Sequence, residues 1–186
     1  MSLGVMNLTL SATLSIMVLF AQDRLGLGPV GYGLLLSSIA VGGVAGSLLA
    51  ERVFDWLGPG TAMRIGLIIE ASTHLVLALS GSEFFIGAVF AAFGFHSIVW
   101  SVISVSLRQE IVPWRLLGRV NSAYLLFAAG GVPVGALLGG ALAGGFGITA
   151  PFWFSFFVVS VLALLIWRTL NNKTMKTARE KTDAGL

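Results

Sequence analysis

The chain contains no cysteine and very few charged residues. Disulfide bonds are therefore excluded, and Lys, Arg, Asp and Glu together make up only 10% of the 186 residues. A soluble domain usually carries about 25% charged residues, and a soluble fold of this length would have too much surface to cover with so few. Hydrophobic residues, in contrast, form 56% of the chain. The composition therefore indicates an integral membrane protein.

The sequence also lacks the residue patterns of metal, nucleotide and catalytic sites. It has only two histidines and no paired carboxylates, so no metal-ligand spacing occurs. The short run Gly26-Leu27-Gly28 follows no strand, so it does not indicate a nucleotide-binding loop. The net charge of +3 comes from residues at the ends of apolar segments, where membrane proteins keep them. We therefore expect no enzymatic activity, no cofactor, no metal and no nucleic-acid partner.

The gaps between charged residues predict six membrane spans. The longest gap, from Val120 to Trp167, corresponds to roughly 70 Å of helix, enough for two crossings. The predicted spans are Met1–Gln22, about Tyr32–Ala50, about Thr61–Ser80, Phe84–Leu107, about Leu117–Ala143 and about Ala150–Trp167. Polar loops are predicted at Glu51–Gly60 and Arg108–Arg119. The expected fold is all-α, with a six-span bundle over residues 1–168 and a basic tail over residues 169–186.

The positions of Lys and Arg predict the orientation of these spans. Six spans place both termini and both polar loops on one side, together with all but one of the 11 basic residues. These residues are Arg52, Arg64, Arg108, Arg115, Arg119, Arg168, Lys173, Lys176, Arg179 and Lys181, whereas the other side holds only Arg24. Because basic residues are retained in the cytoplasm, we expect a multi-pass protein of the cell membrane with both termini cytoplasmic.

Two motifs carry a family resemblance. The run Pro113-Trp114-Arg115-Leu116-Leu117-Gly118-Arg119-Val120-Asn121-Ser122 resembles a pattern of proline, four residues and Gly-Arg-Val-Asn. That pattern opens the eleventh helix in drug, macrolide and siderophore exporters of the major facilitator superfamily. The run Gly46-Ser47-Leu48-Leu49-Ala50-Glu51-Arg52-Val53-Phe54-Asp55-Trp56-Leu57-Gly58 looks like a worn copy of the superfamily's loop signature. Asp55 and Gly58 match that signature, while Trp56 and Pro59-Gly60 stand where basic residues are usual.

The resemblance implies the C-terminal half of a transporter. Members of the superfamily pack two six-helix halves around a central cavity, so this chain would supply helices seven to twelve. The implied function is proton-coupled efflux, by antiport and alternating access, of a small amphipathic substrate. Its partners would be membrane lipid and either an N-terminal six-helix half or a second copy of the chain. Two alternatives stay open: a homodimeric half-transporter, and a non-transporting membrane subunit that packs through small-residue helix faces.

Three ionisable residues inside predicted spans are candidates for substrate binding or proton coupling. Glu70 lies near the middle of the third span, where an ionised carboxylate is costly. His74 follows at i+4, so it shares a helix face with Glu70 and could exchange a proton with it. His96 lies in the fourth span, whose counterpart in the superfamily lines the cavity. Each of the three could instead be a packed side chain with a hydrogen bond to a neighbouring helix.

Five residues near the predicted cytoplasmic loops are candidates for a gate. They are Asp55, Gly58, Arg115, Gly118 and Arg119. An acidic residue can hold an arginine or a helix N-terminus in one conformation and release it in another. A purely topological role, in which the charges fix orientation, is the alternative.

A set of glycines and one proline predicts close helix packing. The set is Gly42, Gly46, Gly131, Pro133, Gly135 and Gly139. Glycines four residues apart share a helix face and allow two helices to approach closely, and Pro133 should kink the fifth span. The expected role is packing, with a moving hinge as the alternative. Four polar residues at or inside the first and fifth spans are expected to form hydrogen bonds between helices rather than to bind substrate. They are Asn7, Asn121, Ser122 and Tyr124.

Overall fold

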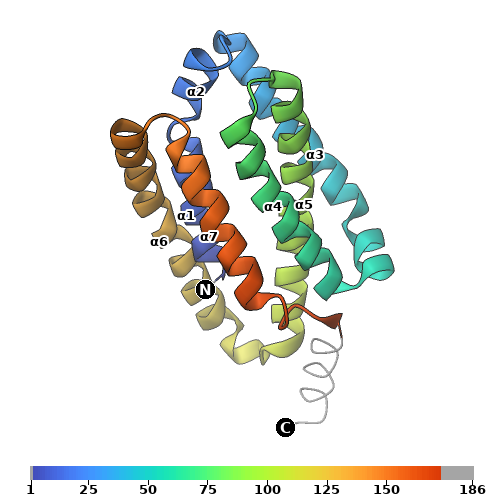
Figure 1. The fold of residues 1–186 in the computed structure, drawn as a ribbon. Coiled ribbons are helices and arrows are strands. Elements are labelled where there is room, and N and C mark those ends of the chain that lie inside the picture. The colour runs from blue at the N-terminus through green and yellow to red at the C-terminus, as the bar shows by residue number, and fades with distance from the viewer. Residues whose placement is uncertain (1, 173–186) are drawn as a thin grey trace.

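The computed structural model describes residues 2–172, and every regular element in that part of the chain is an α-helix. The helices are α1 (Ser2–Leu14), α2 (Met17–Asp23), α3 (Pro29–Leu57), α4 (Pro59–Leu79), α5 (Glu83–Ile111), α6 (Trp114–Phe146) and α7 (Ala150–Ile166). Together they form six membrane spans, because α1 and α2 follow each other in one span (Figure 1). The predicted all-α bundle of six spans is thereby confirmed. The predicted basic tail from Lys173 onward lies outside the described residues.

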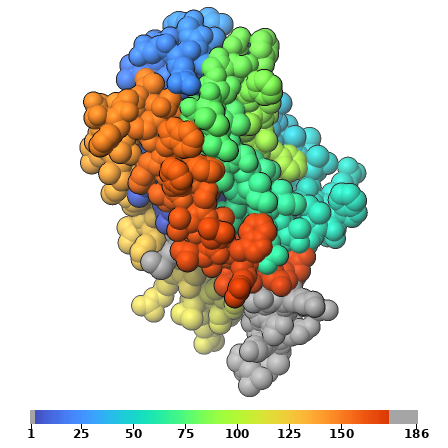
Figure 2. Space-filling model, in the orientation of Figure 1, coloured from blue at the N-terminus to red at the C-terminus, as the bar shows by residue number. Residues whose placement is uncertain are grey.

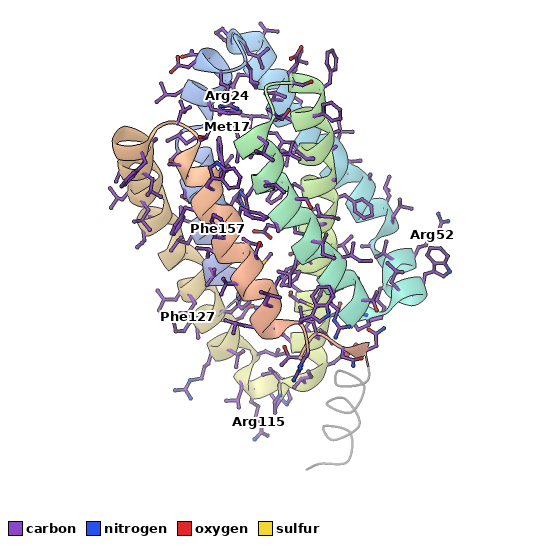
Figure 3. The ribbon with its side chains drawn as sticks, viewed as in Figure 1. Met17, Arg24, Arg52, Arg115, Phe127 and Phe157 are labelled. Atoms are coloured by element: carbon purple, nitrogen blue, oxygen red, sulfur yellow. The ribbon has the colours of Figure 1, made fainter. Side chains whose placement is uncertain are left out.

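The lengths of the helices fit a membrane. Within residues 2–172, five helical segments are long and apolar enough to cross it: Leu3–Asp23, Pro29–Leu57, Pro59–Leu79, Glu83–Ile111 and Trp114–Phe146. The sixth, α7, is shorter, with 17 residues. Basic side chains mark the two ends of the bundle: Arg24 lies at one end and Arg115 at the other (Figure 3). We call the end with the α3–α4 and α5–α6 turns the basic end.

The predicted loops at the basic end are wrong, because the helices continue through them. The interval Glu51–Gly60 was expected to be a loop, but α3 extends to Leu57 and only Gly58 separates it from α4. Likewise α5 extends to Ile111 and α6 begins at Trp114, so the expected loop Arg108–Arg119 shrinks to two residues. Charge ends a membrane span, but it does not end a helix, whose backbone remains hydrogen-bonded in water.

Glycine and proline set the helix ends that charge does not. Gly58 has φ 73° and ψ 159°, a conformation that side chains disfavour, and it terminates α3. Pro113 disfavours helical geometry in the residue before it, and Val112 is accordingly extended, with φ −95° and ψ 124°. Gly147, with φ 96°, ends α6 in the same way as Gly58 ends α3.

The first span contains an interruption that the sequence did not indicate. Helix α1 ends at Leu14 and α2 starts at Met17, with Ile16 at φ −111° and ψ 2° between them. No glycine or proline lies at this point. Ser15 donates its hydroxyl to the Ala12 carbonyl 2.9 Å away, so that its side chain bonds back to the last turn of α1.

Two helix pairs form the framework of the bundle. Helix α3 packs on α5, and α1 packs on α6; these are the most extensive helix contacts in the described chain. Helix α4 contacts α5 on one side and α7 on the other, and α7 also contacts α1. On the face shown in Figure 2, α4 and α7 lie side by side and join the two pairs.

The bundle has two apolar cores, one toward each end. The core at the basic end consists of Met6, Ala50, Ala62, Met63, Leu67, Val99, Trp100, Ile103 and Leu170. The core at the Arg24 end consists of Ile16, Met17, Phe20, Leu35, Leu77, Ala78, Ile86, Phe90 and Phe152. Phe20 and Phe152 meet edge-to-face there, with their ring centroids 4.8 Å apart. The helix segments between the two cores carry the buried polar residues.

Candidate functional site

A layer of buried polar side chains separates the two apolar cores. Its members are Thr9, Thr13, Glu70, Thr73, His74, His96 and Ser155. On α4 the order along the chain is Leu67 in one core, then Glu70 and His74, then Leu77 in the other core. Because α1 and α5 show the same succession, the polar groups of different helices come to the same depth. We call this set the polar layer.

Three contacts in the polar layer connect four helices. Ser155 of α7 donates to the Thr9 carbonyl of α1 at 3.1 Å. Thr13 Oγ1 of α1 lies 3.1 Å from His74 Nδ1 of α4, within hydrogen-bond distance. Glu70 Oε2 of α4 lies 3.7 Å from His96 Nε2 of α5. The layer thus runs continuously from α7 through α1 and α4 to α5.

The residue that faces Glu70 is His96 rather than His74. Although His74 follows Glu70 at i+4 on α4, its ring turns to α1 and meets Thr13. Glu70 is 2% exposed and His96 is 4% exposed, so the pair is closed off from the surroundings of the bundle. Gly66 makes room for this arrangement, because a Cβ there would stand 3.0 Å from His96 Nδ1.

The histidine rings keep unused hydrogen-bonding capacity. Among the described residues, neither ring nitrogen of His96 has a hydrogen-bond partner, and the same holds for His74 Nε2. Such atoms are uncommon in protein interiors and often belong to functional groups. The ring of His96 thus faces Glu70 with both nitrogens free of other hydrogen bonds among the described residues. Within the described residues, Glu70, His74 and His96 do not form a metal-binding group.

Two adjoining cavities lie against α1, and the Glu70–His96 pair borders one of them. That cavity, of about 190 Å³, is lined by Leu3, Met6, Asn7, Leu10, Glu70, Phe93, His96, Ser97 and Trp100. The second, of about 330 Å³, lies between α1 and α6 and is lined by Asn7, Leu10, Ser11, Leu14, Ser15, Val132 and Ala136. Because Asn7 and Leu10 line both, the cavities meet along α1. Their walls are mostly apolar with a few polar groups, a composition shared by many small-molecule sites.

Polar side chains of α1 bind α6 just before Pro133. Asn7 donates to the Ala128 carbonyl at 3.1 Å, and Ser11 donates to the Val132 carbonyl at 2.7 Å. The first of these bonds confirms the prediction that Asn7 bonds between helices. Pro133 lies inside a continuous α6 and lacks the N–H that would bond a carbonyl one turn earlier. The α1 side chains thus hold α6 at its weakest turn.

The glycines lie in the two tight helix contacts. A Cβ at Gly42 would overlap the Ala91 carbonyl of α5, and one at Gly46 would stand 2.7 Å from the Phe95 carbonyl oxygen. On α6, a Cβ at Gly131, Gly135 or Gly139 would overlap the backbone of α1, at Gly4, Leu8 and Ala12 in turn. These small-residue faces are occupied by helices of the same chain. This disfavours the alternative of a subunit that recruits a partner through them.

Two gate candidates lie where α3 meets α4. Asp55 is an exposed residue in the last turn of α3, rather than in the loop where it was expected. It lines a surface groove with Leu49, Arg52, Val53, Trp56 and Leu57. Gly58 supplies the positive φ of the turn, and a Cβ there would stand 2.6 Å from the Asn172 side chain. The structure thus gives Gly58 a backbone role and places Asp55 beside it.

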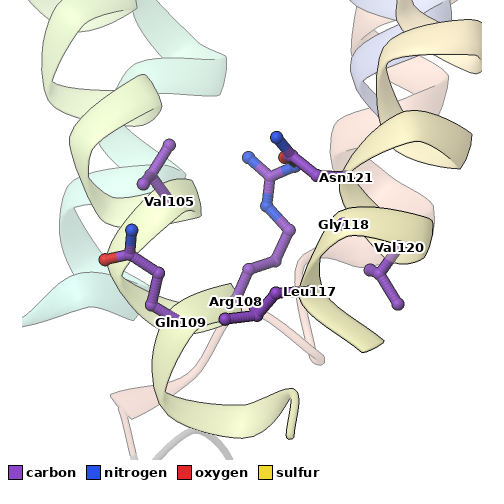
Figure 4. A pocket seen from close by; sticks show the side chains of 7 residues that line it. All are labelled: Val105, Arg108, Gln109, Leu117, Gly118, Val120 and Asn121. Carbon is purple, nitrogen blue, oxygen red and sulfur yellow. Dashed lines mark hydrogen bonds between the residues drawn. The ribbon is translucent and has the colours of Figure 1, made fainter. Parts of the chain in front are cut away.

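The other gate candidates lie on the first turns of α6, together with an arginine that sequence reasoning did not select. Arg115, Gly118 and Arg119 are exposed. Arg108 of α5 instead reaches across to α6, where its Nη1 donates to Asn121 Oδ1 at 3.0 Å (Figure 4). Its guanidinium lies 3.5 Å from the centroid of the Tyr124 ring. The bond confirms that Asn121 binds another helix.

Arg108 stands at a pocket between α5 and α6. The pocket measures about 250 Å³ and is lined by Val105, Arg108, Gln109, Leu117, Gly118, Val120 and Asn121 (Figure 4). Helices α5 and α6 have little other contact with each other. Arg108 therefore ties the two helix pairs together at the basic end. In the sequence, Arg108 is simply an arginine at the edge of an apolar run, and other arginines have the same position. The sequence therefore did not single it out.

Comparison with known proteins places the chain in a transporter family. The profile described as Major Facilitator Superfamily matches residues 1–186. A hexuronate transporter of Bacillus subtilis is 27% identical over 96% of this chain and 41% of its own length. The enterobactin exporter EntS of Escherichia coli is 27% identical over 86% of the chain and 39% of its own length. An arabinose-proton symporter of Bacillus subtilis is 29% identical over 66% of the chain and 26% of its own length.

The chain spans about two fifths or less of each of these relatives. Such a share fits one six-helix repeat of a protein that is built from two. With the apolar helices of the bundle, the match makes this a multi-pass membrane protein of a transporter family rather than an enzyme.

Proposed function

Since the chain belongs to the Major Facilitator Superfamily, we propose that it forms the C-terminal six-helix half of a secondary active transporter. The transported molecule is small and amphipathic, and it leaves the cell in exchange for protons. Both termini and the basic end face the cytoplasm, because the Lys and Arg residues gather there. The membrane is the cell membrane.

The observation that carries this proposal is the Glu70–His96 pair beside the cavity along α1. The carboxylate and the imidazole lie 3.7 Å apart in a wall that is otherwise mostly apolar. An ionised carboxylate is costly at membrane depth. A bound substrate changes the surroundings of Glu70, so substrate binding and protonation of Glu70 influence each other. Binding a proton and releasing a substrate are then linked events, as exchange across a membrane requires.

The direction of transport is supported by the motif at the start of α6. Pro113, Gly118, Arg119 and Asn121 follow the pattern of exporters, and EntS is named as an exporter. The name of another relative, the arabinose-proton symporter, pairs a sugar with a proton. A proton-driven exporter would have both properties, outward transport and the use of protons.

The gate at the basic end would use charges of α3 and α6. Asp55, Arg115 and Arg119 are exposed there, and Gly118 is exposed beside them. Exposed charges on two helices can pair with a facing half in one conformation and separate in the other. In this mechanism Arg108 keeps α5 and α6 together while the halves rock.

The partner of the bundle is an N-terminal six-helix half. Helices α3 and α6 are the least buried of the long helices in the described chain. α6 exposes large apolar side chains such as Leu126, Phe127 and Leu137. Lipid covers part of this surface, and the partner half closes the cavity along α1. A second copy of the chain would provide the same closure with the same orientation, because the two halves of the fold are related by an axis along the membrane normal.

Transport in everted membrane vesicles tests the function. Vesicles that contain the protein as the cell makes it should accumulate ethidium or a macrolide when a proton gradient is imposed, and a protonophore should abolish accumulation. Glu70→Gln should remove the dependence on the gradient. Glu83→Gln is the matched control, because Glu83 lies in the first turn of α5, away from the polar layer. Transport that ignores the gradient, or that runs only inward, refutes the mechanism.

The mass of the native product separates the two partners. An antibody raised against residues 173–186 should detect a band about twice the 19.5 kDa of this chain if an N-terminal half is joined to it. A band near 19.5 kDa, with a crosslinked species of two copies, favours the homodimer instead.

A further inference from the structure

The segment that follows α7 returns to the junction of α3 and α4. Leu170 is buried in the apolar core at the basic end. Arg64 of α4 holds the start of this segment, donating from Nε and Nη2 to the Trp167 carbonyl at 2.9 and 2.6 Å. The Arg64 guanidinium also lies 5.1 Å from the centroid of the Trp167 ring. The chain is thereby led along α4 toward the first turn of that helix.

Asn172 ends this segment with four hydrogen bonds. Its Oδ1 accepts from the backbone N–H groups of Gly60 and Thr61, at 2.7 and 3.3 Å. Its Nδ2 donates to the Leu57 carbonyl at 3.0 Å and to Thr61 Oγ1 at 3.1 Å. The amide thus binds the last residue of α3 and the first turn of α4 at the same time.

Asn172 supplies what the N-cap residue of α4 lacks. The N-cap position is Gly58, which has no side chain to accept the free N–H groups of the first turn. An N-cap asparagine normally accepts from the second and third helical residues. Those are Gly60 and Thr61, which Asn172 reaches from 112 and 111 residues away in the chain. A local cap is excluded because the turn needs a glycine with positive φ.

The glycines of the junction fit this long-range cap. A Cβ at Gly60 would stand 2.6 Å from the backbone nitrogen of Asn172, and one at Gly58 would stand 2.6 Å from its Nδ2. Both glycines therefore make space for the same residue, Asn172. Glycine in the Gly58-Pro59-Gly60 turn thus serves two purposes: it permits the backbone conformation of the turn, and it leaves space for Asn172.

We propose that Trp167–Asn172 is a latch that holds the end of α3 and the start of α4 together. The latch contains a single side chain that is both acceptor for α4 and donor to α3, so its loss frees both helix ends together. Because Asp55 lies in the last turn of α3, the latch also fixes the backbone next to this exposed carboxylate. This inference does not depend on the proposed transport function.

Hydrogen exchange at the amides of Gly60 and Thr61 tests the latch. In the full chain in lipid nanodiscs, Asn172→Ala should accelerate exchange at both amides roughly fivefold, the usual effect of losing an N-cap. Asn172→Asp retains the acceptor and should keep both amides slow. Thr169→Ala is the control, because the Thr169 hydroxyl bonds only back to the Ile166 carbonyl at 2.7 Å. Equal exchange in the wild type and Asn172→Ala refutes the cap.

A second variant completes the test. Gly60→Ala displaces Asn172 from the opposite side and should accelerate Thr61 exchange as Asn172→Ala does, with no further effect in the double variant. Additive effects of Gly60→Ala and Asn172→Ala on Thr61 exchange would refute the shared contact.

Discussion

Substitution of adjacent glycines on α3 should have opposite effects on stability. Gly42 faces α5 so closely that a Cβ would overlap the carbonyl of Ala91, whereas a Cβ at Gly43 would lie 3.6 Å from the nearest Ile98 carbon, an ordinary contact. The two positions share one helix, one residue type and one membrane depth. A comparison of Gly42→Ala with Gly43→Ala therefore isolates the effect of the helix contact.

The magnitude follows from two opposing effects. Alanine stabilises a helix interior relative to glycine by about 0.5–1 kcal/mol. An added methyl group in a packed contact costs about 1–3 kcal/mol, and the Gly42 site is at the upper end because the obstacle is backbone. We expect Gly43→Ala to be neutral or stabilising and Gly42→Ala to be destabilising, with a difference of about 2 kcal/mol. For a chain of this size the difference corresponds to roughly 4–8 °C in Tm.

Thermal unfolding of the protein in detergent micelles measures the difference. Gly94→Ala should behave like Gly42→Ala, because a Cβ there would overlap the Ile39 carbonyl of α3. Since either methyl group already separates the helices, the double variant should lose less than the sum of the two single losses. Equal Tm values for Gly42→Ala and Gly43→Ala would show that α3 and α5 do not pack as closely as described.

Three further variants, the first paired with a control, test other contacts. Arg108→Ala should lower the free energy of unfolding by about 2 kcal/mol, because it removes a charged hydrogen bond and a ring contact, while Arg115→Ala, at an exposed site, should leave it within about 0.5 kcal/mol. Thr13→Val should cost about 1–3 kcal/mol, since it leaves the His74 ring buried without its partner. Gly58→Ala should cost about 1–3 kcal/mol, because the residue has a positive φ. Denaturant titration of each variant in micelles provides all three values.

The sequence predicts the number of helices because charged residues are rare inside a membrane and therefore mark the ends of the spans. Apolar runs between charged residues must be helical in lipid, where every backbone group needs an internal partner. The same reasoning fails at the ends, where α3 and α5 continue into water beyond Ala50 and Leu107. Outside the membrane, helix length depends on glycine and proline at Gly58 and Pro113. Those residues were visible in the sequence but carried less weight than the charges.

The candidate site could be located from the sequence, but its pairing could not. Glu70 was recognisable because a carboxylate within an apolar span is rare. Helical spacing indicated His74 as its neighbour, and the actual neighbour, His96, comes from a different helix. That contact depends on how α4 and α5 are rotated and displaced against each other, which close packing at Gly66 decides. Spacing within a helix contains no information on this arrangement.

The polar layer lies where α4 meets the two helix pairs. The tight contacts of α3 with α5 and of α1 with α6 involve backbone against backbone, so the two helices of each pair are closely packed. Helix α4 stands between the pairs, and it touches one through Glu70 and His96 and the other through His74 and Thr13. Under the proposed proton coupling, a change of protonation at Glu70 would therefore act where α4 meets the two helix pairs, rather than within either pair.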